Sequence, residues 1–215
     1  MDTFETTVAG VREIGTDAVA IDVTTPSGFE AIPGQFVKLS TTIGDEPVSR
    51  FYTVSSPDTA DTFELTVSYD PEEGGEFSEY LLSLETGDSL TIAGPFGADH
   101  YEDEPRVVVL AGGPGIGPAV AIAERALGDG GTAAVVYRDD EPLHEDRLAA
   151  LATAGAEVFV LTEETDLTAV VADMLRQEPG EQVFIYGFGE FIGDAEAALE
   201  AAGGDAGEAK SENFG

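Results

Sequence analysis

The chain has 215 residues, 42% of them hydrophobic, and it contains no cysteine. This length suffices for two domains of ordinary size, each with its own core. Without cysteine, these 215 residues form neither a disulfide nor a cysteine-ligated iron–sulfur cluster. His100 and His144 are the only histidines, and we expect both to be exposed structural residues, with no bis-histidine haem and no histidine-rich metal site.

The formal net charge is −34, from 43 acidic and 9 basic residues. A nucleic-acid-binding protein needs the opposite sign, so this partner class is disfavoured. The acidic residues are spread along the whole chain, and only Lys38 and Lys210 are lysines. Dispersed acidic charge is tolerated where molar salt screens self-repulsion. The composition therefore predicts a halophilic protein.

Two further features bear on location. Residues 1–5 are acidic and polar, unlike a secretory signal. The uncharged run at residues 107–123 is interrupted by four glycines and two prolines, which argues against a membrane span. We therefore expect a cytoplasmic protein without a membrane-spanning segment.

The first half of the chain consists of short β-type segments separated by glycine, proline and aspartate. The expected strands are residues 4–11, 19–24, 35–40, 51–55, 63–69 and 89–93, with one helix at residues 78–84. Several short strands at this spacing are typical of an antiparallel barrel. We predict an N-terminal antiparallel six-stranded β-barrel over residues 1–101.

The character of the sequence changes after residues 100–105, which we interpret as a linker. Beyond it, the expected strands are residues 107–110, 133–137, 157–161 and 182–186, and the expected helices are residues 118–127, 145–154, 167–177 and 191–202. Apolar strands between amphipathic helices indicate a doubly wound parallel sheet. We predict an α/β domain over residues 102–215, so the fold class is β + α/β.

The segment Arg50-Phe51-Tyr52-Thr53 begins just before the fourth expected strand and runs into it. Its cation, aromatic ring and hydroxyl are expected to project to one side of the strand. Such groups suit the phosphate, the planar ring and a ring nitrogen of one redox cofactor. Taken singly, Arg50 could be a surface salt-bridge partner, Tyr52 a core aromatic and Thr53 a plain strand residue. Their combination favours a cofactor site.

Two glycine-containing segments could receive phosphates. Residues 74–78 open the predicted helix of the barrel, where free N–H groups suit a phosphate, although Ser78 could instead be an ordinary N-cap. Residues 112–118 read as strand, glycine turn and helix, and glycines let the backbone approach a pyrophosphate. Any tight connection between a strand and a helix could also use such a turn.

The choice of coenzyme depends on the end of the second strand of the α/β domain. Arg138 can accept a 2′-phosphate, whereas Asp139 can bind ribose hydroxyls. Asp139 could also be part of an acidic halophilic surface. Molar salt weakens a phosphate contact, so the sequence favours NADH and leaves NADPH open.

With these motifs the chain resembles the ferredoxin–NADP reductase-like flavoprotein superfamily over nearly its whole length. The resemblance implies FAD rather than FMN as the cofactor, with NADH or NADPH as co-substrate. It implies an enzyme that transfers hydride from the nicotinamide to the flavin and then electrons to a separate acceptor. Such an acceptor could be a ferredoxin, a haem protein or a free carrier.

The resemblance also implies residue roles. Arg50 would face the flavin phosphates, Tyr52 would stack on the isoalloxazine ring, and Thr53 would face flavin N5. The implied catalytic residues are Tyr52, Thr53, Glu212 and Phe214. The implied cofactor-binding residues are Arg50, Tyr52, Thr53, Val54, Ser55, Val67, Gly75, Glu76, Phe77, Ser78, Gly112, Gly113, Pro114, Gly115, Pro118, Arg138, Asp139, Gly187 and Phe188.

Three residues differ from the family pattern. Pro114 replaces a threonine of the glycine turn, Tyr186 replaces a cysteine beside the nicotinamide, and Phe188 replaces a proline. Two other functions therefore stay open. One is a flavin reductase that uses diffusing flavin as a substrate, and the other is a non-catalytic redox or nucleotide-sensing subunit.

The acidic composition yields a first prediction. Dialysis from molar salt into dilute buffer should abolish most of the far-UV circular dichroism signal, because unscreened carboxylates repel one another in the compact state. A chain that kept its full signal in dilute buffer would contradict the halophilic interpretation.

Overall fold

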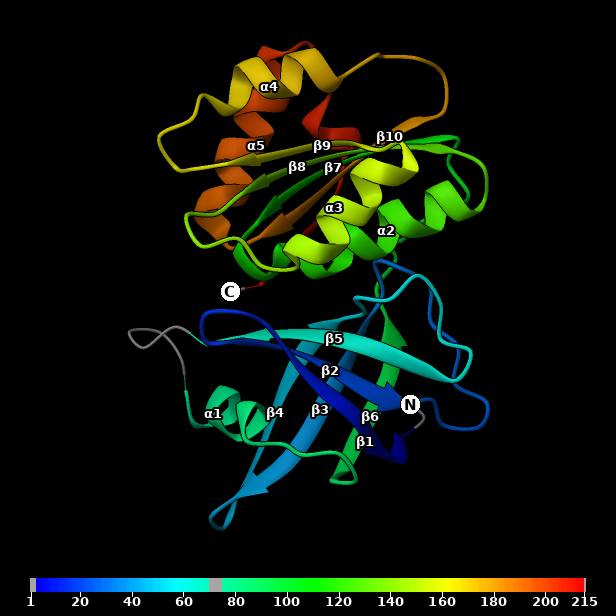
Figure 1. The fold of residues 1–215 in the computed structure, drawn as a ribbon, viewed down its shortest axis with the longest axis vertical. Helices are drawn as coiled ribbons and strands as arrows, with labels where there is room; N and C mark the ends of the chain where they lie inside the picture. The colour runs from blue at the N-terminus through cyan, green and yellow to red at the C-terminus, as the bar shows by residue number, and fades with distance from the viewer. Residues whose placement is uncertain (1–2, 70–74, 215) are drawn as a thin grey trace. The chain divides into compact units, whose positions relative to one another are not determined.

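The computed structural model describes residues 3–69 and 75–214, and it divides into two compact units, Met1–His100 and Tyr101–Gly215 (Figure 1). The first unit is built from antiparallel strands and the second from parallel strands with helices. Each unit is described by itself.

The six strands of the first unit are β1 (Thr3–Gly15), β2 (Ala18–Thr24), β3 (Phe36–Ile43), β4 (Glu46–Thr53), β5 (Thr62–Ser68) and β6 (Ser89–Phe96). They form one sheet in the order β4-β3-β6-β1-β2-β5. The two edge strands approach each other through a bridge between Val54 and Leu65 and a hydrogen bond from Ser55 N to Glu64 O of 2.8 Å. The sheet is thereby nearly closed, and the predicted six-stranded antiparallel barrel is confirmed.

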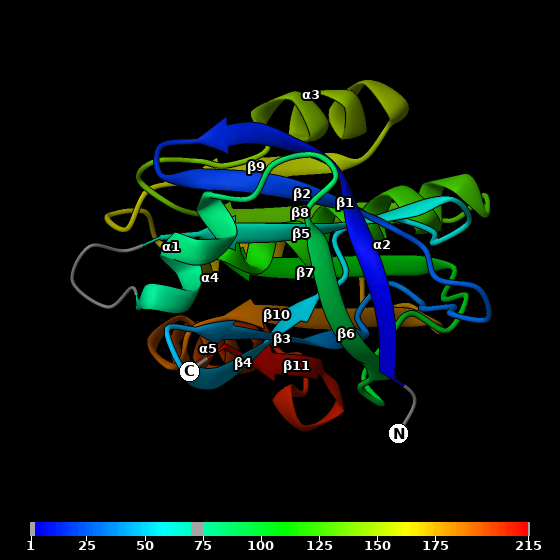
Figure 2. The ribbon, with the colours of Figure 1, turned by 90° about the horizontal axis from the view of Figure 1, so that it is seen from below.

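The long strand β1 turns the corner of this barrel. Residues Thr3–Thr7 pair with β6, and the following residues pair with β2, so the two halves of β1 lie beside different neighbours (Figure 2). The register shifts between Val8 and Gly10, which marks a β-bulge. A bulge bends its strand, and here it lets one strand belong to both sides of the barrel.

Helix α1 (Glu76–Leu82) belongs to the first unit. It buries Phe77 and Leu81, which are four residues apart and therefore share one face of the helix. Both contribute to the barrel core with Val37, Leu39 and other buried residues. The helix was expected at residues 78–84, so it begins and ends two residues earlier than predicted.

The five strands of the second unit are β7 (Arg106–Gly112), β8 (Thr132–Arg138), β9 (Glu157–Leu161), β10 (Glu181–Gly187) and β11 (Lys210–Asn213). They are parallel, in the order β11-β10-β7-β8-β9. Every residue of β7, the middle strand of the sheet, is buried. Strand β11 was not predicted, because its sequence Lys-Ser-Glu-Asn is polar and it pairs only at the edge.

Helices cover both faces of this sheet. Helices α2 (Ile116–Gly128) and α3 (Glu145–Ala154) lie on one face, and α4 (Leu167–Met174) and α5 (Gly189–Ala201) lie on the other (Figure 1). The predicted doubly wound parallel sheet is therefore confirmed. Helix α4 ends at Met174 rather than near residue 177, because Leu175 already has an extended backbone with φ −70° and ψ 128°.

Two expectations about single segments are corrected. Residues 101–105, expected within a linker, are anchored to the second unit: Tyr101 is buried, and the carboxylates of Glu102 and Glu104 each bind Lys210 Nζ at 2.7 Å. His144, expected to be exposed, is buried at the residue that precedes α3. Its backbone is left-handed, with φ 55°.

No helix among residues 3–69 and 75–214 is long and apolar enough to cross a membrane.

A buried ion-pair network ties together the amino-terminal ends of the strands of the second unit. The Arg106 guanidinium binds Glu181 at 2.8 Å and Glu157 at 3.2 Å, and it donates to the carbonyl of Met174 at 2.8 Å. The Arg106 and Glu181 side chains are only 6% and 5% exposed. Arg106 thereby connects β7, β9, β10 and the end of α4.

This network yields a stability prediction. Arg106→Met should lower the free energy of unfolding by about 3–5 kcal/mol, because it leaves the Glu181 carboxylate buried without its cation. Urea unfolding at one fixed salt concentration measures the change. The control is Arg125→Ala, which removes an exposed pair with Asp129 and should cost at most about 1 kcal/mol. Equal losses in the two variants would contradict the role given to Arg106.

Candidate functional site

In the first unit, Arg50 and Tyr52 lie on the same face of β4. The register with β3 places them opposite Leu39 and Val37. Thr53 lies on the other face, opposite Phe36, so the expectation that all three side chains project to one side is wrong. Alternation along the strand separates neighbouring residues, so a ligand that touches Tyr52 and Thr53 must lie across the end of β4.

Helix α1 supports the Tyr52 side chain. The Tyr52 ring is stacked on the Phe77 ring, with centroids 6.3 Å apart and planes at 21°. Burial raises the pKa of Tyr52 above its ordinary value, while a hydrogen bond with Ser78 and the positive charge of Arg50 partly offset this effect. The phenol therefore stays protonated at neutral pH and can act as a hydrogen-bond donor.

The interaction with Tyr52 also decides the role of Ser78. The N-cap of α1 is Gly75, and no side chain caps the helix, so the alternative in which Ser78 is the N-cap is wrong. The Ser78 and Glu79 N–H groups both donate to Gly75 O. Glu76 is exposed at the first turn. Gly74, which was included in the predicted glycine segment, lies outside the described residues.

Arg50 differs from most basic residues of the chain. Its guanidinium donates to the carbonyl of Ser49 at 2.9 Å, and its side chain is exposed. Among residues 3–69 and 75–214, Arg50 and Lys38 are the two basic side chains that form no ion pair with a carboxylate. In a chain with 43 acidic residues, a guanidinium that has no carboxylate partner and lies beside an aromatic ring can bind an anionic ligand.

Three other predicted flavin contacts are part of the barrel interior. Val54 and Val67 belong to the buried core. The Ser55 hydroxyl is fully buried and accepts hydrogen bonds from Thr66 N at 3.1 Å and Thr66 Oγ1 at 2.9 Å. All three residues are fully buried, and the Ser55 hydroxyl helps to join the segment after β4 to β5.

In the second unit, the glycine turn runs from the end of β7 through the short 3₁₀ helix η1 (Gly113–Gly115) into α2. A Cβ on Gly112 would lie 2.4 Å from the Phe191 ring, and one on Gly115 would lie 2.2 Å from the carbonyl oxygen of Tyr186. Gly113 has φ +55° and only a distant neighbour. Packing therefore requires glycine at two positions, and backbone conformation favours it at the third.

The surface of this turn is formed by Gly113 and Pro114, which are partly exposed. Gly115 and Pro118 are buried, so they shape the turn from within. Pro118 lies in the first turn of α2, as expected. A pyrophosphate at this turn would meet the backbone of Gly113 and Pro114, and proline supplies no N–H.

Phe191, on α5, was missed by the sequence-based prediction. Its ring lies against Gly112 and Gly187, the last residues of β7 and β10, and the Arg138 guanidinium lies 5.1 Å from the ring centroid. It therefore joins the carboxyl ends of three strands. Two glycines at strand ends, followed by an aromatic residue early in a helix, were the available signal.

At the end of β8, Arg138 and Asp139 are both engaged. Arg138 Nη2 binds Asp194 Oδ2 of α5 at 2.8 Å. Asp139 accepts a hydrogen bond from the Tyr137 hydroxyl at 2.9 Å and another from Glu141 N at 2.9 Å. Both predicted coenzyme-selecting side chains are thus present at one strand end, each already held by the protein.

The carboxyl-terminal segment runs beside β10. Glu212 pairs with Tyr186 across the two parallel strands, and Phe214 N donates to Gly187 O at 3.0 Å. The Phe214 ring meets the Phe188 ring edge to face at 6.3 Å. Tyr186 is buried, so the position of the family cysteine is filled by a side chain of the interior.

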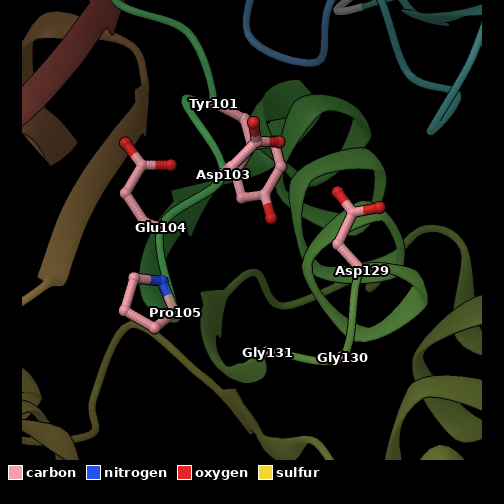
Figure 3. A pocket seen from close by; sticks show the side chains of 7 residues that line it. All are labelled: Tyr101, Asp103, Glu104, Pro105, Asp129, Gly130 and Gly131. Carbon is pink, nitrogen blue, oxygen red and sulfur yellow. The ribbon is translucent and has the colours of Figure 1, made fainter.

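A hollow of about 420 Å³ lies elsewhere in the second unit, lined by Tyr101, Asp103, Glu104, Pro105, Asp129, Gly130 and Gly131 (Figure 3). Burial and the nearby Asp129 and Asp103 carboxylates raise the pKa of Tyr101 to about 12. Two of the carboxylates that line the hollow already bind cations: Asp129 binds Arg125, and Glu104 binds Lys210. It lies where β7 begins, whereas the glycine turn lies where β7 ends, so it is separate from the candidate site.

The sequence of this chain is similar to those of known proteins. Residues 6–101 match the family described as an oxidoreductase FAD-binding domain. The chain is 30% identical over 145 residues to the toluate 1,2-dioxygenase electron transfer component of Pseudomonas putida, a match that covers 66% of this chain and 40% of that protein. This chain spans about 25–40% of the length of the curated relatives it matches.

Two solved structures match the whole chain. The FAD/NAD-binding domain of nitric oxide dioxygenase from Vibrio cholerae superposes with a TM-score of 0.81 at 21% identity, and 100% of each chain is covered. A ferredoxin NADP+ reductase from Neisseria gonorrhoeae, solved with FAD and NADP, superposes with a TM-score of 0.80 at 20% identity and the same coverage. At such identities these matches show the fold.

Residues 6–101 match a family of FAD-binding oxidoreductase domains, and the whole chain has the fold of the solved flavoproteins. This confirms the β + α/β fold class and agrees with the predicted family resemblance. The matched family covers the barrel with Arg50 and Tyr52, and the solved structures extend the likeness in fold through the glycine turn to the end of the chain.

The packing around Phe191 is testable. Gly112→Ala should lower the free energy of unfolding by about 1–3 kcal/mol, because the new methyl group overlaps the ring. The matched control is Gly128→Ala at the end of α2, where a Cβ meets nothing within 4 Å, and its stability should not fall. In a Phe191→Leu background the penalty of Gly112→Ala should shrink, and an unchanged penalty would refute the contact as its cause.

Proposed function

We propose that this protein is an FAD-dependent oxidoreductase that takes reducing equivalents from NADH or NADPH and passes them to a separate electron acceptor. The observation that carries the proposal is the pair Arg50 and Tyr52 on one face of β4, with an uncompensated cation beside a supported aromatic ring. The match of residues 6–101 to a family of FAD-binding oxidoreductase domains supports the same conclusion. FAD bound there would supply the redox chemistry, accepting hydride and releasing electrons singly.

The residues of the first unit fit such a cofactor. Arg50 would bind the phosphates through a charge-assisted hydrogen bond. Tyr52, fixed in orientation by Phe77 and Ser78, would present its ring to the isoalloxazine, and Thr53 would reach the edge of that ring system across the end of β4. Gly75, Glu76 and Phe77 would contribute backbone groups at the start of α1.

The second unit would bind the nicotinamide nucleotide. The backbone of Gly112, Gly113, Pro114 and Gly115 would receive the pyrophosphate, and Arg138 with Asp139 would meet the adenosine ribose. Gly187 and Phe188 would border the nicotinamide. Glu212 and Phe214 are proposed near the flavin ring, where Phe214 would cover one face of it.

The acceptor is proposed to be another protein with a one-electron centre, such as a ferredoxin or a haem protein. The sequence contains no cysteine, so these 215 residues cannot hold an iron–sulfur centre with cysteine ligands. The Pseudomonas putida relative is an electron transfer component of a dioxygenase, which supports a partner of this kind. A cytoplasmic location at molar salt is proposed from the composition.

One experiment tests the function directly. Protein purified in molar salt should carry bound flavin, and NADH or NADPH added without oxygen should bleach its absorption in a stopped-flow instrument. Colourless protein that reduces added flavin would favour a flavin reductase instead. Bound flavin that neither nucleotide bleaches would favour a sensing subunit, and protein unable to bind flavin would overturn the proposal.

The Arg50 contact has a matched control on the neighbouring strand. Arg50→Ala should weaken FAD binding on the order of tenfold to a hundredfold, because it removes a charge-assisted hydrogen bond. Lys38→Ala removes the same charge from the opposite face, where Lys38 pairs with Phe51, and should leave FAD affinity unchanged. Equal weakening in both variants would show a general charge effect rather than a contact.

A further inference from the structure

We propose that the ion pair between Asp194 and Arg138 selects the coenzyme, by keeping the Arg138 guanidinium from binding the 2′-phosphate of NADPH. This inference rests on the proposed nucleotide site at the end of β8 and adds a residue of α5 that determines its specificity. Asp194 is neither on a strand end nor in the glycine turn, so no sequence motif points to it.

The geometry holds Arg138 in one place. Its Nη2 atom lies 2.8 Å from Asp194 Oδ2, and its guanidinium lies over the Phe191 ring at 5.1 Å from the centroid. The Arg138 side chain is 15% exposed, whereas that of Asp194 is 54% exposed. The cation is therefore held between a ring and a carboxylate that faces solvent, and an incoming phosphate must compete with that carboxylate.

The second carboxylate at this strand end is also fixed. Asp139 Oδ2 accepts from the Tyr137 hydroxyl and Oδ1 accepts from Glu141 N, both at 2.9 Å. Burial raises the pKa of Tyr137 above its ordinary value, so its phenol remains a donor. The Asp139 carboxylate is thus held in one orientation as an acceptor, which suits the hydroxyls of a ribose and repels a phosphate.

The local charges favour the coenzyme without the phosphate. Arg138 brings one positive charge, and Asp139 and Asp194 bring two negative charges, so the strand end is net negative. A 2′-phosphate would add further negative charge and find the Arg138 guanidinium already paired, a like-charge arrangement that strongly disfavours binding. Removal of the Asp194 charge would free Arg138 for that phosphate.

The test measures nucleotide binding rather than activity. Adenosine 2′,5′-bisphosphate and 5′-AMP are titrated calorimetrically into wild-type protein and Asp194→Asn at one fixed salt concentration. Asp194→Asn, which preserves the side-chain shape, should bind the bisphosphate on the order of tenfold more tightly, with 5′-AMP affinity unchanged. The ratio of kcat/KM for NADH to that for NADPH should also be lower in Asp194→Asn than in the wild-type protein.

Two further variants assign the effect. Glu200→Gln removes one exposed negative charge from the far end of α5 and should leave both affinities unchanged. Adding Arg138→Ala to Asp194→Asn should abolish the gain. If 5′-AMP binds but Asp194→Asn does not alter the preference, this inference fails while the nucleotide site stands. If no protein binds either nucleotide, the proposed site and the inference fail together.

Discussion

The carboxyl end of the second sheet depends on the position of one ring. Phe191 packs so closely on the ends of β7 and β10 that a Cβ on Gly112 or Gly187 would lie 2.4 or 2.8 Å from it. Such distances are shorter than carbon atoms tolerate, so both residues must be glycine while the ring stays in place. The same ring supports the Arg138 guanidinium at the end of β8. A turn that resembles a phosphate-binding motif is therefore also a packing solution, and the two requirements reinforce each other.

The scarcity of basic residues makes the position of each one informative. With 9 basic residues against 43 acidic ones, a cation in this chain easily finds a carboxylate. Arg106 uses its carboxylates to fasten strand ends inside the second unit, and Arg138 uses Asp194 to fasten β8 to α5. Arg50, like Lys38, forms no such pair among the described residues, and the proposed flavin site rests on Arg50.

In the barrel, some residues support the side chain proposed to meet the ligand, and others close the sheet. The face of β4 with Tyr52 is supported by Phe77 and Ser78 of α1, whereas Ser55 at the end of the strand closes the sheet against Thr66. Rigid supports of this kind orient an aromatic side chain before any cofactor arrives, which lowers the entropy lost on binding.

The sequence by itself determined the class of fold, the family resemblance, every described strand except the polar edge strand β11, and the segments that carry Arg50, Tyr52 and the glycine turn. Alternating or continuous apolar residues and turn-forming glycines are local signals, so they can be read without coordinates. Tertiary structure alone decided that Thr53 turns away from Tyr52, that Ser78 supports Tyr52 rather than capping α1, and that Phe191 and Asp194 reach the end of β8. These outcomes join residues up to 56 positions apart, and no local pattern encodes which distant side chains meet.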